Sequence, residues 1–184
     1  MKSIATSQLL AALEARVDRH LERAISIYQN LTDLELNRAS PSGGWSIAQC
    51  LEHLNSYGDY YLPQIRKAIN TYEGKPSLTT RRGWLGNYFV NMMDPDVSNI
   101  GYKAFKGHIP NSDLNGHQVV ARFIQQQEDL LLLLRKAEVA NLELIRIPIS
   151  ITRFIRLRLG DTFEFMIMHD ERHIRQADRN FQSE

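Results

Sequence analysis

RLRLGDTFEFMIMHDERHIRQADR, residues 156–179, carries the helical pattern that decides the fold of this chain. Asp161 and Glu164 have the spacing of a carboxylate cap followed by an acidic residue at the third helical position. A helix is therefore predicted from Thr162 to about Phe181. Side chains three and four residues apart share one face of such a helix, so its apolar and polar residues separate onto different sides.

Three other stretches have the same three- and four-residue spacing of apolar side chains, namely 10–31, 47–72 and 116–140. Ser46 and Asn115 precede the second and third of these stretches, and each is followed three residues later by a glutamine. Ser and Asn are favoured N-cap residues because their side chains accept hydrogen bonds from the first turn of a helix. Four long amphipathic helices are expected.

The long connection at residues 74–114 contains an apolar run of its own, WLGNYFVNMM. A connection of this length usually has internal structure. We predict a short helix or lid that roofs a pocket, forms a dimer contact or covers the core. Its apolar residues on one helical side are Trp84, Leu85, Tyr88, Phe89, Met92 and Met93.

The stretch LIRIPISITRFIRLRL, residues 144–159, alternates isoleucines with polar residues or proline, as extended segments do. It is expected to be a single extended segment, which does not make a sheet. The predicted fold is therefore all-α, a four-helix bundle with a long crossover between its second and third helices. The length of 184 residues predicts one domain, 1–184.

Composition limits the classes of function. Apolar residues make up 43% and charged residues 23%, which is typical of a globular protein. The net charge of +1 gives no field for binding nucleic acid or acidic lipid, so neither nucleic acid nor a membrane is expected as a partner. Glu14 and Arg16 interrupt a short apolar run, which is wrong for a signal peptide or membrane span and predicts a cytoplasmic protein. Cys50 is the only cysteine, which excludes an internal disulfide.

Two histidines four residues apart, His169 and His173, lie with Gln176 in one narrow sector of the last helix. Residues at this spacing have Cβ atoms ~5–6 Å apart, so both rings can reach one ion. A third ligand from another helix would complete an open site, and His53 is the natural candidate. Its place on the helical wheel suits either a cavity between helices or the solvent-facing side.

The alternative is that these histidines are only polar helix residues and bind no metal. A four-residue histidine pair arises by chance often enough to be a weak signal alone. The remaining histidines, His20, His108 and His117, are expected at the solvated surface.

Two segments resemble signatures of the DinB-like (YfiT-related) superfamily. GGWSIAQCLEHLNSYGDYY, residues 43–61, is similar to its second helix, and residues 156–179 are similar to its last helix, which ends in His-x-x-x-His-x-x-Gln. The resemblance implies an up-down-down-up four-helix bundle with one divalent ion, commonly nickel or zinc. By this resemblance the ligands are His53, His169 and His173, and Gln176 either hydrogen-bonds a ligand or packs.

The resemblance also implies two activities on a small molecule, because relatives are described as metal-dependent hydrolases and others as transferases or isomerases that use low-molecular-weight thiols. Three neutral imidazoles leave a bound ion an open position, as in catalytic zinc sites. No catalytic base is identified, because Glu52 and Asp170 are turned ~100° from the adjacent histidines. Tyr57 and Tyr61 are candidates for orienting substrate, with core packing as the alternative for each.

Other residues have simpler interpretations. Cys50 is expected to be a buried apolar residue rather than a ligand or nucleophile. The arginines of the extended segment form either a rim for an anionic substrate or a solvated edge: Arg146, Arg153, Arg156 and Arg158.

The competing function is a non-catalytic, stress-associated binding or dimerisation module. In that case an ion, if bound, only joins the second helix to the fourth, and the partner is a second copy of the chain in a homodimer.

Overall fold

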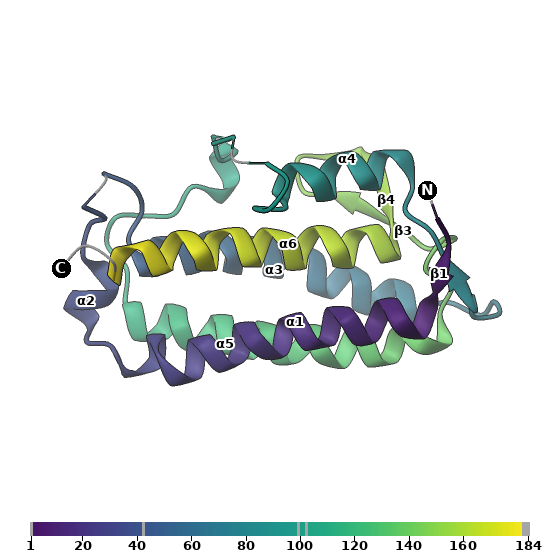
Figure 1. The fold of residues 1–184 in the computed structure, drawn as a ribbon, viewed down its shortest axis with the longest axis horizontal. Coiled ribbons are helices and arrows are strands. Elements are labelled where there is room, and N and C mark those ends of the chain that lie inside the picture. Colours follow the sequence, from purple (N-terminus) through teal and green to yellow (C-terminus); the bar gives the residue numbers. More distant parts are fainter. Residues whose placement is uncertain (1, 42, 99, 102, 182–184) are drawn as a thin grey trace.

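The computed structural model describes residues 2–41, 43–98, 100–101 and 103–181, and this part of the chain is mainly helical (Figure 1). Its long helices α1 and α3 each pack against both α5 and α6. The prediction of a mainly helical protein is confirmed. The four long helices are α1 (Thr6–Ser26), α3 (Ile47–Asn70), α5 (Gly116–Lys136) and α6 (Leu159–Asp178).

Shorter elements connect and cover these helices. The short helices are α2 (Asp33–Asn37), α4 (Trp84–Met93) and the 3₁₀ turns η1 (Tyr28–Asn30), η2 (Lys106–His108), η3 (Ala137–Val139) and η4 (Arg179–Phe181). Two small antiparallel sheets pair β1 (Ile4–Ala5) with β2 (Thr79–Thr80), and β3 (Arg146–Ile149) with β4 (Thr152–Arg158).

Two helix starts follow the predicted caps. The Ser46 side chain accepts from the Gln49 backbone N–H while the Gln49 side chain accepts from the Ser46 N–H, a complete capping box. The Asn115 side chain accepts from the Gln118 N–H at the start of α5. The α3 helix continues through Pro63 without being divided.

The core consists of two clusters of buried apolar side chains. One contains Tyr61, Leu130 and Phe163, and the other contains Leu54 and Phe123. Fully burying a Leu or Phe side chain stabilises a fold by roughly 1.5–3 kcal/mol. Both clusters draw residues from α1, α3, α5 and α6, so apolar packing joins the long helices along their length.

The prediction of one extended segment at 144–159 is wrong, because the chain reverses there and forms the β3–β4 hairpin. Ile147 and Leu157 pair across it and are buried, whereas β4 exposes Arg153 through Arg156. Ser150 and Ile151 connect the strands. Neither is the Gly, Asn or Asp that usually marks a two-residue hairpin turn, so the sequence lacked the signal.

Asp161 does not cap α6, contrary to the sequence prediction. The helix begins at Leu159, and Asp161 lies inside its first turn. Its carboxylate accepts hydrogen bonds from the Gly83 N–H at 3.1 and 3.2 Å and so caps the start of α4. Burial raises the pKa of Asp161 to about 6.

The short helix predicted at residues 84–93 is confirmed as α4, which lies on the outside of α6 (Figure 1). Its apolar residues do not form one buried side. Phe89 packs on Phe165 with ring centroids 6.1 Å apart, whereas Trp84 and Tyr88 are 80% and 60% exposed. One part of the run covers the core and the other faces outward.

Candidate metal centre

Three histidines from two long helices come together between α3 and α6. The candidate ligand atoms of His53, His169 and His173 all lie within 4.8 Å of one another, and His53 Nε2 is 3.1 Å from His169 Nε2. Two ring nitrogens that bind one zinc ion at ~2.0–2.1 Å are roughly 3.3 Å apart in a tetrahedral site. The donor set and its spacing therefore fit a divalent ion.

The cluster is mostly enclosed by the protein. His53 and His169 are each 3% exposed, and His173 is partly exposed. The alternative that His53 faces solvent is therefore wrong.

Hydrogen bonds fix the orientation of two of the rings. His53 Nδ1 lies 2.6 Å from the backbone oxygen of His108, and His173 Nδ1 lies 2.9 Å from Gln176 Oε1. Both oxygens only accept, so each Nδ1 carries the hydrogen and donates. The Nε2 atoms are then left with their lone pairs, which is the form that binds a metal. Gln176 thus hydrogen-bonds a candidate ligand rather than only packing.

Aromatic side chains surround the three imidazoles. Ring centroids of Trp45 lie 4.9 Å from His53 and 5.7 Å from His173. Tyr57 lies 4.5 Å from His169, and Phe165 stacks on the same ring at 5.8 Å. These contacts hold the rings in place and exclude water from the buried side of the cluster.

Burial keeps the imidazoles neutral. Loss of hydration lowers the pKa of His53 to about 4 and that of His173 to about 3, and it lowers the pKa of the more deeply buried His169 well below its usual range. Near neutral pH all three rings are unprotonated. Metal ions bind histidine in this form, so protons compete weakly at this site.

His108 is a residue of the site that the sequence did not indicate. The expectation of a solvated surface position is wrong, because its ring is half-buried and stacks on Tyr57 with centroids 3.9 Å apart. It belongs to η2, far along the chain from His53. Every residue type has a backbone oxygen, so the sequence does not indicate which distant residue makes this contact.

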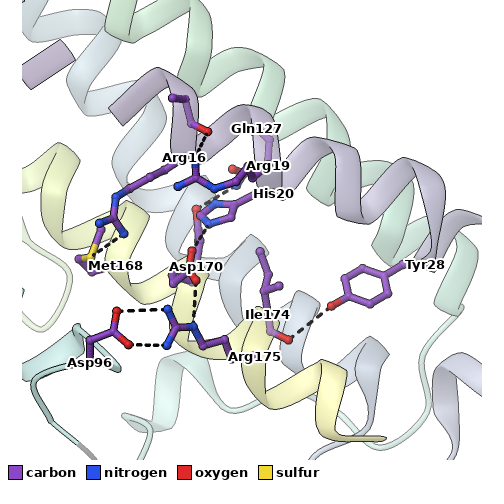
Figure 2. Close-up of polar contacts among 12 residues, drawn as sticks. Arg16, Arg19, His20, Tyr28, Asp96, Gln127, Met168, Asp170, Ile174 and Arg175 are labelled. Carbon is purple, nitrogen blue, oxygen red and sulfur yellow. Dashed lines mark hydrogen bonds and ion pairs between the residues drawn. The ribbon is translucent and has the colours of Figure 1, made fainter. Parts of the chain in front are cut away.

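His20 is also misplaced by the sequence prediction. It is 3% exposed, and its Nε2 lies 3.0 Å from Glu171 Oε2 on α6. Beside it, Gln127 of α5 donates to Asp170 at 3.0 Å, so polar contacts link three helices (Figure 2). Asp170 thus points toward α5, and burial raises its pKa to about 6.

The remaining sequence candidates occupy simpler positions. Cys50 is fully buried, and burial raises the pKa of its thiol to about 12, which suits an inert apolar residue. Glu52 pairs with Arg122, and Tyr61 accepts from the Ser150 N–H. His117 is exposed, as predicted. Of the four arginines, Arg158 pairs with Glu143, while the others lie at the exposed surface: Arg146, Arg153 and Arg156.

A mainly helical protein with a mostly buried histidine triplet between two long helices belongs to a class that can bind a metal ion inside its helical core. Residues 16–177 match the model of the DinB superfamily, and the chain belongs to this superfamily. Comparison with curated proteins and with solved structures gives no match. In the described part of the chain, no helix has the length and apolar character needed to cross a membrane.

Proposed function

We propose that this protein binds one divalent metal ion, zinc or nickel, through His53, His169 and His173 and acts as a hydrolase or thiol-dependent transferase on a small molecule. The 3.1 Å separation of His53 Nε2 and His169 Nε2 carries the proposal. With the Nδ1 atom of His53 donating elsewhere, a proton or a cation is needed between these two nitrogens. A metal ion placed between these two nitrogens can also be bound by His173.

The side chains around the cluster have separate tasks in this proposal. When bound, the ion supplies an open coordination position that polarises a carbonyl or activates water or a thiol. Gln176 and the His108 carbonyl hold two ligands in the required tautomer. Tyr57 is proposed to orient the substrate, since its ring lies 4.5 Å from that of His169. Burial raises the pKa of its hydroxyl to about 12, so this group stays protonated.

The four long helices are proposed to form the up-down-down-up bundle of a single domain. The order of contacts supports this arrangement, because α1 runs with α6, α3 runs against α6, and α3 runs with α5. For α1 and α6, the contacts are Arg16 with Met168 and Arg23 with Asp178. For α3 and α6, they are Trp45 with Asn180 and Tyr61 with Phe165. For α3 and α5, they are Asn55 with Val119 and Arg66 with Asp129.

The second candidate function is a non-catalytic module in which the ion only joins α3 to α6. The origin of the ligands favours it, since His53 comes from one helix and His169 from the other. In either case the proposed partners are small molecules, including a low-molecular-weight thiol, or a second copy of the chain. Neither nucleic acid nor a membrane is proposed, given a net charge of +1.

Elemental analysis of purified protein tests metal binding. Wild-type protein is expected to carry about one zinc or nickel ion per chain, since its three imidazoles form one site. His169→Ala should lose the ion, and His117→Ala, which changes an exposed histidine, should retain it. Absence of metal from wild-type protein, or its retention by His169→Ala, would contradict the proposal.

Activity is tested on thiol adducts, esters and amides with metal-loaded and chelated protein. Turnover that depends on the metal and on His169 supports the enzyme. Metal-dependent stability without turnover of any of these substrates favours the module that only joins α3 to α6.

A further inference from the structure

We propose that His108 is a positioning residue for the metal ligand His53, and this inference rests on the proposed function. His108 lies in the crossover between α4 and α5, outside the three-histidine cluster. Its backbone oxygen holds the ring of His53, and its own side chain is what holds that oxygen in place.

The first step is the contact with the ligand. The His108 oxygen lies 2.6 Å from His53 Nδ1 and accepts its hydrogen. This contact fixes both the tautomer and the rotation of the His53 ring, so Nε2 faces His169 Nε2. Partners of this kind beyond the metal ligands typically change metal affinity by ~10–100-fold when they are lost.

The second step is the attachment of the His108 side chain to α3. The Ser56 hydroxyl donates to the His53 backbone oxygen at 2.6 Å, so at 2.8 Å it accepts from His108 Nδ1. The His108 ring also stacks on Tyr57 at 3.9 Å with the planes 26° apart. Ser56 and Tyr57 lie one helical turn after His53, so a single face of α3 carries the ligand and both contacts to His108.

The third step is that little else fixes η2 at this point. None of its residues is buried, and the flanking Phe105 and Ile109 are each 54% exposed. The segment is therefore not anchored there by apolar packing. Loss of the His108 side chain should let its backbone oxygen move away from His53.

Isothermal titration with zinc, on wild-type protein, His108→Ala and Ser56→Ala, tests the inference. Both variants remove the same hydrogen bond, and each is expected to weaken zinc binding by ~10–100-fold. His117→Ala serves as the control and should bind like wild type. Urea unfolding of His108→Ala in the presence of a chelator checks that this variant is folded. A cooperative transition is expected, because the substitution does not change the apolar core.

A second readout separates positioning from a general loss of structure. The ¹⁵N shifts of the His53 ring in metal-free protein should report the Nδ1–H tautomer in wild type and a mixture of tautomers in His108→Ala. Wild-type zinc affinity in His108→Ala overturns the inference and leaves the proposed function standing. Failure of wild-type protein to bind zinc or nickel overturns both.

Discussion

At the scale of single residues, His53 is predicted to make the metal-free protein less stable in acid. An unfolded histidine has a pKa near ~6.5, whereas burial lowers the pKa of His53 to about 4. Between these values the unfolded chain binds a proton that the folded protein does not. The free energy of unfolding therefore falls as pH falls through this window, by at most ~1.4 kcal/mol per pH unit for this residue.

The measurement is urea unfolding of chelated wild type and His53→Gln at several pH values between neutral and acidic. The variant's free energy of unfolding should fall less steeply. Asp161 and Asp170, with pKa values raised to about 6, act in the opposite direction and favour the folded state as pH falls. Both carboxylates are present in the two proteins, so their effect cancels in the comparison. Parallel pH profiles for the two proteins would rule the prediction out.

The sequence could indicate His169 and His173, because two ligands on one face of a helix are four residues apart in the sequence. His53 needed the family signature, since its position on the helical wheel allowed two environments. His20 and His108 were misplaced for a physical reason. His20 contacts Glu171 and His108 contacts Ser56, and each partner belongs to another element of the fold. Such contacts cannot be predicted from the residues next to each histidine in the sequence.

At the scale of secondary-structure elements, Gly86→Ala is predicted to loosen α4 from α6. A Cβ at Gly86 would overlap the side chain of Asp161, which caps α4 at Gly83. Alanine favours a helix over glycine by ~1 kcal/mol. Overpacking by ~1–3 kcal/mol, together with a cap weakened by ~1 kcal/mol, outweighs that gain. We expect net destabilisation by about 1–3 kcal/mol, measured by urea unfolding.

Two further variants test the cause of this effect. Gly101→Ala is the matched control, because a Cβ there meets no atom within 4 Å and stability should hardly change. In an Asp161→Gly background, Gly86→Ala should be harmless or stabilising, since the whole overlapping side chain is gone, including the Asp161 Cβ that would lie 2.5 Å from the added Cβ. An equal loss in both backgrounds would show that Asp161 is not the cause.

The starts of α3 and α5 were predictable because Ser46 and Asn115 bond to their own helices. Asp161 has an equally good local pattern, yet it bonds to Gly83 of another helix. The β3–β4 hairpin was missed because Ser150 and Ile151 are not typical turn residues. Local rules thus worked where the partner is local and failed where tertiary contacts took over.

At the scale of the whole molecule, the order of the four long helices brings together ligands that are 116 residues apart in sequence. The sequence could predict the helices from their apolar spacing, but that spacing does not state which helices are neighbours. The arrangement proposed above came from the family resemblance. The contact of the buried His20 with Glu171 is an example of what the sequence did not indicate, since it joins α1 to α6 without any shared motif.

The last prediction concerns the stability of the whole fold with and without metal. Zinc that binds only the folded state should raise the free energy of unfolding by ~2.7 kcal/mol at 100 times its dissociation constant. His169→Ala should show no such gain, and His117→Ala should respond like wild type. Chelated wild-type protein should keep its helical circular dichroism, because two apolar clusters join the long helices without an ion. Unfolding on chelation would instead assign the ion the structural task of holding α3 to α6, and it would count against a site kept open for substrate.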